Sequence, residues 1–367
     1  MQVIGVMTGT SMDGIDACLV DLSGSAPRRV ASRHADLPQH LRNELHRVQA
    51  SDWHKDPLLQ TAEAAQGLMH AFVPVIESLV KESPGPVEAV GIHGQTVRHW
   101  PELGMSLQLA APALLAERIG IDVVSDFRSR DLAAGGEGAP LVPPFHAAIV
   151  QGRHPGPVAV LNLGGIANLS LIEGDRVLGF DTGPANTLMD LWSQAHRGQA
   201  YDAGGEWADS AVPSWALVDL LSDDPYFRRT GPKSTGRDYF SLAWLQRHLD
   251  QLSERPSAAT VQASLLALTA RTILAKIPDQ TQAVYLCGGG ARNAALVRAL
   301  RAGLPDPCSL QDTASLGWPA EDIEAGAFAW LAGQHLLRRA GNQPDVTGAR
   351  GPRILGSLTP GSLAPRS

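Results

Sequence analysis

The chain opens with two short apolar runs that flank a polar turn. Residues 3–7 and 15–22 are mostly apolar, and glycine, threonine, serine and aspartate dominate the segment between them. Two such runs around a glycine-bearing turn predict a β-hairpin with a polar loop at its tip. A similar arrangement recurs near the middle, where Gly164 and Gly165 separate the apolar runs 157–163 and 166–172. We therefore predict a duplicated architecture.

Helices and further strands alternate between and after the two hairpins. Apolar residues at helical spacing predict helices over 57–81, 112–118, 260–277, 293–302 and 323–339. Short apolar runs predict strands over 87–92, 107–109, 122–125, 177–180 and 283–286, the fourth leading through a turn into a helix that ends near 192. Alternating strands and helices indicate an α/β fold, and the hairpins make its sheets mixed rather than all parallel.

The length of the chain, 367 residues, predicts two domains, since a domain usually has about 100–200 residues. We expect an N-terminal lobe over 1–145 and a C-terminal lobe over 146–340. Residues 341–367 are rich in Gly, Pro and Arg and are expected to form an extended tail.

Composition excludes several functional classes. Hydrophobic residues make up 44% and charged residues 18%, which is typical of a globular protein, and the net charge of -7 argues against nonspecific nucleic-acid binding. Three distant cysteines predict no disulfide framework, and no CxxC or His-rich cluster indicates structural zinc. The sequence shows no secretory signal and no apolar run of roughly 18 residues, so we expect a cytoplasmic protein without a membrane anchor.

The tip of the first hairpin is a candidate phosphate loop. Its glycines permit close approach of a ligand to backbone N–H groups, and the hydroxyls of Thr8, Thr10 and Ser11 suit phosphate oxygens. Asp13 or Asp16 could reach Mg²⁺ directly or through water. A plain hairpin turn with solvated side chains fits the segment equally well. The loop is not of the Walker A type, because GxxxxGK[ST] does not occur.

Two later loops also carry chemistry. Asp181 follows an apolar strand and precedes a glycine turn and a helix, a position where α/β proteins place active sites and where N–H groups favour phosphate. The carboxylate is placed to act as a general base, and a helix N-cap is the alternative. The run Gly288, Gly289, Gly290 between a strand and a helix would let a flat ligand such as adenine lie against bare backbone. An ordinary strand-to-helix turn is again the alternative.

The ordered set of these three loops resembles the sugar kinase, Hsp70 and actin superfamily. In that superfamily a cleft between duplicated domains binds ATP through two phosphate loops and an adenosine loop. The resemblance implies two actin-like ATPase lobes of the ribonuclease H type, each a mixed sheet flanked by helices, with ATP in the cleft.

Shorter motifs narrow the resemblance. The sequences GTSMDGID at 9–16, HGQT at 93–96, DFRSRD at 126–131, AAGGEGAPLVP at 133–143, NLGGIAN at 162–168 and FDTGP at 180–184 look like those of the anhydro-N-acetylmuramic acid kinase family. The resemblance covers residues 1 to about 340, and the residues at Ser129 and Glu137 depart from the family's pattern. It implies conversion of 1,6-anhydro-N-acetylmuramic acid, ATP and water into N-acetylmuramic acid 6-phosphate and ADP, with Mg²⁺ as cofactor, as part of peptidoglycan recycling.

The resemblance also assigns roles to residues of this chain. Asp181 would be the base that activates water. ATP would be bound by Gly9, Thr10, Ser11, Met12, Asp13, Gly14, Ile15, Asp16, Gly164, Gly165, Asn168, Gly183, Gly288, Gly289, Gly290 and Asn293. The sugar would be bound by His93, Gln95, Thr96, Arg128, Arg130 and Glu324. The metal ligands are not indicated.

Some of these roles have structural alternatives. Arg128 and Arg130 suit the lactyl carboxylate, but we expect at least one of them to form an ordinary salt bridge. His93 could instead be a structural histidine bonded to backbone, and Glu324 could be a solvated helix residue. The expected partners are ATP and the sugar, with a homodimer left open and no nucleic acid or membrane. A same-fold kinase for another sugar and a nucleotide switch of the actin or Hsp70 kind remain as alternative functions.

Overall fold

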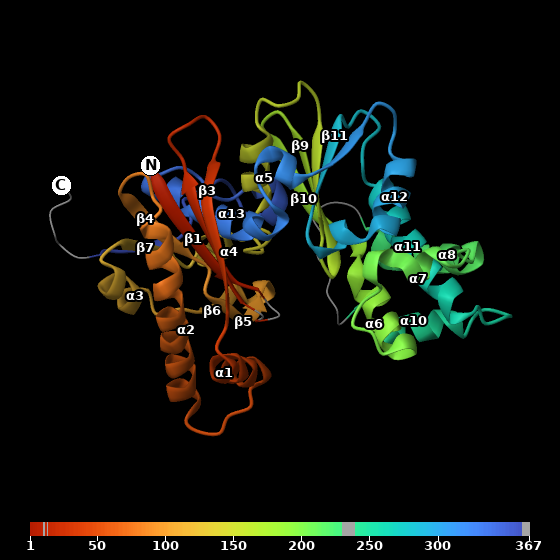
Figure 1. The fold of residues 1–367 in the computed structure, drawn as a ribbon, viewed down its shortest axis with the longest axis horizontal. Coiled ribbons are helices and arrows are strands. Elements are labelled where there is room, and N and C mark those ends of the chain that lie inside the picture. Colours follow the sequence, from red (N-terminus) through yellow and green to blue (C-terminus); the bar gives the residue numbers. More distant parts are fainter. Residues whose placement is uncertain (10–11, 13, 230–238, 362–367) are drawn as a thin grey trace. The chain divides into compact units, whose positions relative to one another are not determined.

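The computed structural model describes residues 1–9, 12, 14–229 and 239–361 (Figure 1). The chain forms two compact units. Unit 1 consists of Met1–Gln151 and Glu321–Ser367, and unit 2 consists of Gly152–Ala320. Both units are α/β.

Unit 1 is built on a six-stranded mixed sheet in the order β13-β7-β4-β1-β2-β3. Its strands are β1 (Gln2–Thr8), β2 (Gly14–Asp21), β3 (Arg28–Asp36), β4 (Val87–Ile92), β7 (Asp122–Ser125) and β13 (Ser357–Thr359). Strands β1, β4 and β7 are parallel, and β2, β3 and β13 run antiparallel to their neighbours. A separate ribbon pairs β5 (Gln95–Trp100) with β6 (Met105–Leu109).

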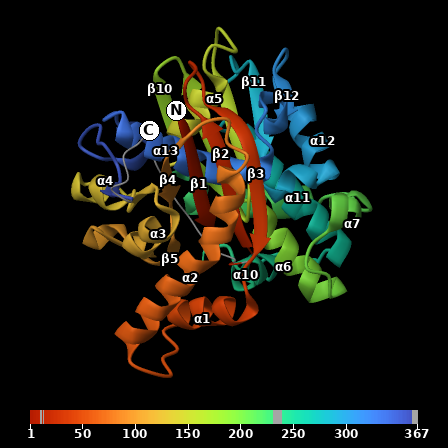
Figure 2. The same ribbon diagram turned by 60° about the vertical axis from the view of Figure 1, so that its left-hand side comes forward.

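Helices cover both faces of this sheet (Figure 2). The helices of unit 1 are α1 (Gln39–Ala50), α2 (Pro57–Val80), α3 (Pro112–Ile119), α4 (Ser129–Ala133), α5 (Pro143–Val150), α13 (Ile323–Leu336) and α14 (Pro344–Thr347). Of these, α2, α3 and α13 contact the sheet directly. Ile4 and Val6 of β1 belong to the core that includes apolar residues of α2. Gly5 faces the other way, and a Cβ there would lie 1.9 Å from the carbonyl oxygen of Ala325. Glycine at this position therefore lets α13 pack directly on the strand.

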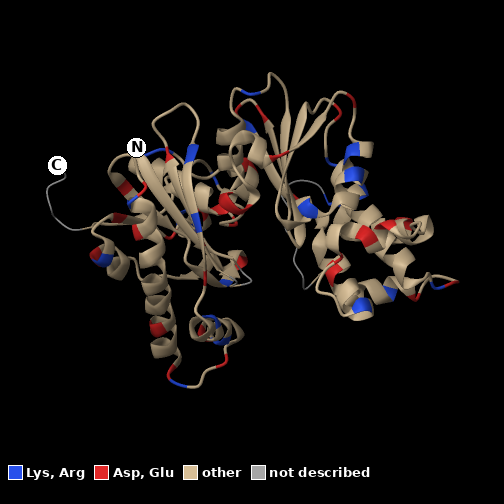
Figure 3. Ribbon diagram, viewed as in Figure 1, with Lys and Arg blue, Asp and Glu red and all other residues tan. Residues whose placement is uncertain are grey.

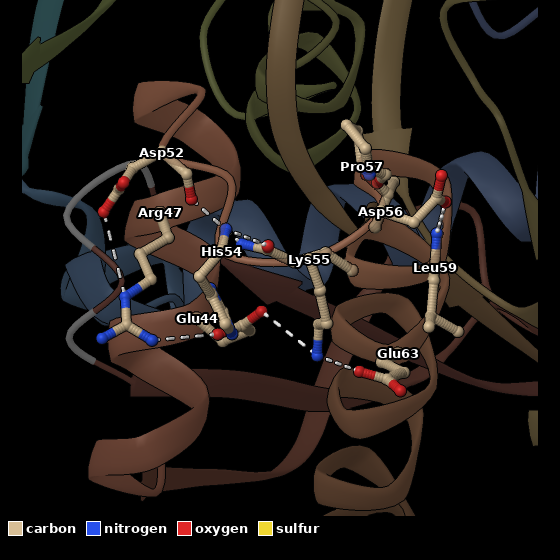
Figure 4. A network of polar contacts seen from close by, with 11 residues as sticks. Glu44, Arg47, Asp52, His54, Lys55, Asp56, Pro57, Leu59 and Glu63 are labelled. Atoms are coloured by element: carbon tan, nitrogen blue, oxygen red, sulfur yellow. Dashed lines mark hydrogen bonds and ion pairs between the residues drawn. The ribbon is translucent and has the colours of Figure 1, made fainter.

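The connection between α1 and α2 carries a polar network (Figure 4). Lys55 pairs with Glu63 and lies 3.9 Å from Glu44. Asp56 caps α2 by accepting a hydrogen bond of 2.9 Å from the amide of Leu59. Exposed ion pairs contribute about 0–1 kcal/mol each, so the cap and the buried face of α2 are the main determinants of this helix.

Unit 2 has a five-stranded mixed sheet in the order β10-β9-β8-β11-β12. Its strands are β8 (Val158–Leu163), β9 (Ile166–Glu173), β10 (Arg176–Pro184), β11 (Ala283–Cys287) and β12 (Ser309–Asp312). Its helices are α6 (Asn186–Arg197), α7 (Glu206–Asp209), α8 (Trp215–Ser222), α9 (Pro225–Arg228), α10 (Leu242–Leu249), α11 (Ala258–Leu274) and α12 (Ala294–Gly303). A core of its own joins this sheet to α6 and to α10–α12.

The two sheets have the same strand topology. Each starts with an antiparallel hairpin, β1–β2 or β8–β9, and a third antiparallel strand, β3 or β10, extends it. On the other side of the first strand lie two parallel strands, β4 and β7 or β11 and β12. The predicted duplication and the mixed sheets flanked by helices are therefore confirmed.

The boundaries of the units differ from the expected lobes. Helix α13, expected in the C-terminal lobe, packs on β1, β2 and β4 in unit 1 because Gly5 and Gly91 admit it. The expected extended tail is also wrong for the part that the structure describes. It forms α14 and β13, and it buries Val346 and Leu355.

Charged residues of both signs are interspersed along both units (Figure 3). Within the described ranges, no helix combines the length and apolar character that a membrane span requires.

Candidate active site

The carboxyl ends of parallel strands bring several predicted residues of unit 1 to one sheet edge. Thr8 ends β1, and its hydroxyl donates a hydrogen bond of 3.3 Å to the carbonyl oxygen of Gly94. His93 follows β4, and its amide donates to the carbonyl oxygen of Val6 at 3.1 Å. Arg128 follows β7. The sequence segments around 8, 93 and 128 therefore meet at the edge where α/β proteins place ligands.

His93 is held in one neutral form by its two partners. Its Nδ1 lies 2.9 Å from the carbonyl oxygen of Gly94, so Nδ1 carries the proton and donates. Its Nε2 is then the acceptor for the Arg128 Nη2 donor at 2.8 Å. Burial, followed by the charge of Arg128, lowers the pKa of His93 to about 3. Both ring nitrogens are occupied, which fits the structural alternative better than direct contact with a sugar.

The two candidate arginines have different environments. Arg128 is partly buried, and its Nη1 donates to the carbonyl oxygen of Gly138 at 2.7 Å. Burial lowers its pKa to about 10, against the opposing effect of the Glu324 carboxylate. Arg130 lies on α4 with an exposed side chain, and its guanidinium has no partner among the residues that the structure describes. Arg128 is thus the arginine engaged by protein groups, although by neutral ones rather than a salt bridge.

Gln95 presents a buried polar atom next to His93. Its side chain is 1% exposed, and its Oε1 has no hydrogen-bond partner within the described part of the chain. A buried acceptor without a donor costs about 1–3 kcal/mol, so this oxygen suits a ligand hydroxyl. Thr96 is partly buried, and its hydroxyl accepts a weak hydrogen bond of 3.4 Å from Gln108.

Carboxylates gather beside Arg128. Loss of solvation and then the charge of Asp16 raise the pKa of Glu324, whereas Arg128 lowers it. The Glu324 side chain is exposed to solvent, and water screens its interactions with both charges. Asp16 accepts a hydrogen bond of 2.7 Å from His34, its cross-strand neighbour. In the described ranges no cluster of three or more His, Cys, Asp or Glu side chains is arranged to hold a metal.

Only part of the first phosphate loop is described. Thr10, Ser11 and Asp13 lie outside the described residues. Gly9 accepts a backbone hydrogen bond of 3.1 Å from Met12. The side chains of Met12 and Ile15 belong to the core of unit 1, so these two residues can offer a nucleotide only their backbone. Gly14 packs against the His34 ring, where a Cβ would lie 2.4 Å from Cε1.

The second hairpin tip in unit 2 packs on the start of helix α6. The carbonyl oxygen of Gly165 accepts hydrogen bonds from the amides of Ala185 and Thr187 at 2.9 and 3.0 Å, and that of Gly164 accepts from Asn186 at 3.1 Å. The expectation that the amides at this helix start face a phosphate is therefore wrong, because carbonyl oxygens occupy them. The amides of Gly164 and Gly165 have no acceptor in the described part of the chain.

Asp181 lies inside β10 rather than at the start of a helix. It pairs with Asn168 of β9, whose Nδ2 donates to its Oδ1. Asn162 donates in turn to Asn168 at 3.3 Å, and Tyr226 donates to the backbone carbonyl of Asp181 at 2.9 Å. The side chain is 8% exposed. The N-cap of α6 is Ala185, so the capping alternative for Asp181 is excluded and a buried, oriented carboxylate remains.

The three consecutive glycines have different surroundings. Gly288 has φ +81°, and a Cβ on it would lie 2.3 Å from the Asn162 Oδ1. A Cβ on Gly290 would lie 2.7 Å from the Cβ of Leu163. A Cβ on Gly289 would have nothing within 4 Å. Gly288 and Gly290 therefore let this loop pack closely against the second hairpin, whereas the space next to Gly289 is free of described atoms.

Two further predicted residues have structural roles. Asn293 caps α12 by accepting a hydrogen bond of 3.0 Å from the amide of Leu296. Gly183 has φ +152°, and a Cβ there would lie 2.6 Å from the Phe227 ring. Each role accounts for the residue type without a ligand.

Sequence reasoning missed several residues that shape these loops. Asn162 orients Asn168, and Asn186 donates from Nδ2 to the carbonyl oxygens of Leu163 and Gly164 at 3.0 and 2.8 Å. Tyr226 lies 45 residues from its acceptor, and no local pattern points to that contact. Asn162 could have been found, because it stands in the same short motif as Asn168.

The duplicated α/β fold with glycine loops at the sheet edges is the fold that the resemblance to sugar kinases and actin-like ATPases implies. The family model for anhydro-N-acetylmuramic acid kinase matches residues 1–361. The chain belongs to this family.

Two relatives of high sequence identity agree with this assignment. Anhydro-N-acetylmuramic acid kinase of Bordetella avium (strain 197N) is 51% identical, over 97% of this chain and 95% of that protein. The protein of the same name from Pseudomonas fluorescens (strain Pf0-1) is 46% identical, over 97% of this chain and 99% of its own. Among solved structures, a ROK family glucokinase from Streptomyces griseus in complex with glucose and AMPPNP has a TM-score of 0.42 at 16% identity, covering 91% of this chain and 100% of that one.

Proposed function

We propose that this protein is an ATP-dependent kinase that opens 1,6-anhydro-N-acetylmuramic acid with water and phosphorylates O6. Membership of the family over residues 1–361 supports the substrate. The observation that carries the mechanism is the position of Asp181. Its buried carboxylate accepts a hydrogen bond from Asn168, and the amides of Gly164 and Gly165 in the adjoining hairpin have no acceptor among the described residues.

The anhydro bridge determines the chemistry. It joins C1 to O6, so O6 has no proton for a base to remove. Water attacks C1, the C1–O6 bond breaks, and O6 forms a bond to the γ-phosphorus as ADP leaves. Asp181 takes one proton from the water, and the other stays on the new C1 hydroxyl. General-base catalysis of this kind contributes about 10²–10⁴-fold.

Unit 2 would supply the base and nucleotide contacts. The open amides of Gly164 and Gly165 suit phosphate oxygens. Gly289 is exposed and has no neighbour that a Cβ would meet, which suits the close approach of an adenosine. In unit 1, Gly9 at the tip of the first hairpin is a further candidate for a phosphate contact.

Unit 1 would supply the sugar contacts. The unpartnered Oε1 of Gln95 accepts from a sugar hydroxyl, and Thr96 and Glu324 are further candidates for sugar contacts. Arg130, with its exposed guanidinium, binds the lactyl carboxylate in a forked contact. Arg128 and His93 hydrogen-bond to each other and would support the sugar-binding residues without contacting the sugar.

Mg²⁺ fits the carboxylates of unit 1. It prefers oxygen ligands and binds through one or two carboxylates plus substrate phosphates. Asp16 is partly exposed, and its charge lies close enough to Glu324 to raise the pKa of that carboxyl group. These two would hold the ion with its waters. When bound, the ion neutralises charge on the phosphates.

Mass spectrometry of the product tests the proposal. With ATP, Mg²⁺ and anhydro-N-acetylmuramic acid, the product should have the mass of the sugar plus one water and one HPO₃ unit. A product without the added water, or none at all, would refute the activity. ADP release that ignores the sugar would favour a nucleotide switch, and turnover of another anhydro sugar alone would favour a different substrate.

The proposal includes a cytoplasmic location, since ATP is the phosphoryl donor. It also includes small molecules as the only partners needed for turnover. A homodimer is compatible with it but not required.

A further inference from the structure

The C-terminal segment of unit 1 folds back on the loop that follows α4. The amide of Glu137 donates to the carbonyl oxygen of Thr347 at 2.8 Å, and the amide of Arg350 donates to that of Ala134 at 2.9 Å. Arg350 also donates from its side chain to the carbonyl oxygen of Ala133 at 3.2 Å. Residues 342–350 thus line the loop 133–138, although more than 200 residues separate them in the sequence.

Asp131 is the centre of this contact. Its side chain is 0% exposed. Its Oδ1 accepts from Asn342 Nδ2 and from the Thr347 hydroxyl, both at 2.7 Å, and its Oδ2 accepts from the amide of Gly138 at 2.9 Å. Asp131 forms no ion pair with any residue that the structure describes. A buried carboxylate is tolerated only when hydrogen bonds compensate its lost hydration, and here the C-terminal segment provides two of them.

The same loop supports the candidate arginines. Gly138 donates to Asp131 with its amide and accepts from Arg128 with its carbonyl oxygen at 2.7 Å. A Cβ on Gly136 would lie 2.2 Å from the Asp131 Oδ2, so the loop closes tightly around the carboxylate. Arg130 directly precedes Asp131 on α4. Holding Asp131 therefore supports Arg128 through Gly138 and fixes the backbone of α4 next to Arg130.

We propose that Asn342 and Thr347 are positioning residues for substrate recognition, acting through Asp131 on the segment 128–138. This inference rests on the proposed function, because it takes that segment as the site of the lactyl carboxylate. On this inference the C-terminal segment contributes to substrate recognition as well as to packing.

The test compares Thr347→Val with Thr347→Ser. Valine keeps the shape of threonine and removes the donor, whereas serine keeps the donor. Hydrogen bonds to charged groups are among the stronger ones, so we expect Thr347→Val to raise the KM for anhydro-N-acetylmuramic acid about tenfold, with the KM for ATP within about twofold. Thr347→Ser should stay near the wild type. Thr313→Val is a matched control, because the buried Thr313 hydroxyl has no partner among the described residues.

A second substrate separates positioning from general damage. The methyl ester of the lactyl group removes the carboxylate charge, and wild-type enzyme should prefer the acid. Thr347→Val should lose most of that preference. If both substrates weaken equally, or ATP and sugar KM rise together, the inference is wrong. If Thr347→Val does not fold, Asn342→Ser is measured in the same way. Wild-type enzyme that ignores the anhydro sugar would refute the proposed function instead.

Discussion

Alanine at Gly288 and at Gly289 should have very different effects, although the positions are adjacent. Gly288 has φ +81° and ψ 167°, a region open essentially to glycine alone, where other residues pay about 1–3 kcal/mol. Its Cβ would also lie 2.3 Å from the Asn162 Oδ1 and 2.9 Å from the carbonyl carbon of Leu163, and such overpacking costs about 1–3 kcal/mol more. We expect Gly288→Ala to lower the free energy of unfolding by about 2–6 kcal/mol.

Gly289→Ala should leave stability nearly unchanged, because no atom lies within 4 Å of the added Cβ. Differential scanning calorimetry measures the contrast, since about 1 kcal/mol shifts Tm by about 2–4 °C in a domain of this size. Gly289→Val should then weaken ATP binding in titration calorimetry without lowering Tm. A stable Gly288→Ala, or a Gly289→Val that binds ATP like the wild type, would refute this account of the loop.

Three further predictions follow from packing and charge. His93 and His146 have pKa values lowered to about 3 by burial, so both stay neutral in the fold while the unfolded chain takes up protons below about 6.5. Stability should fall by about 1.4 kcal/mol per histidine for each pH unit below that value, and a urea midpoint that does not change from pH 7 to pH 5 would contradict it. Gly5→Ala should lower Tm through its clash with α13, whereas Gly85→Ala, with nothing within 4 Å, should not. Arg130→Met should raise the KM for the sugar and leave Tm unchanged. A lowered Tm with an unchanged KM would mean that Arg130 stabilises the fold and does not bind the sugar.

Much of the fold could be predicted because apolar runs and glycine turns are local signals. Strand β4 has the predicted bounds, and both hairpins form as expected. Strand β3 could not be predicted, since Arg28, Arg29, Arg33 and His34 break its apolar pattern at the edge of the sheet. The C-terminal segment resembles a tail in composition, and it packs through contacts with Asp131 that no sequence window contains.

The sequence predicts which residues form the candidate site better than it predicts what each of them does. Motifs indicate His93 and Arg128, but only the structure reveals that they bond to each other. The start of α6 resembles a phosphate site in sequence, yet the carbonyl oxygens of Gly164 and Gly165 occupy its amides. Such competition between backbone groups depends on tertiary packing, which spacing along the chain does not encode.

Turnover in ¹⁸O-water tests the central claim most directly. If Asp181 activates water for attack on C1, the wild-type product should carry ¹⁸O at the C1 hydroxyl and none in the bond from C6 to phosphorus. Product incubated in ¹⁸O-water without enzyme controls for exchange at C1. Asp181→Asn, which keeps the shape but cannot accept the proton, should lower kcat by about 10²–10⁴-fold while ATP and sugar still bind. Label between C6 and phosphorus, or an Asp181→Asn enzyme with wild-type kcat, would contradict the account.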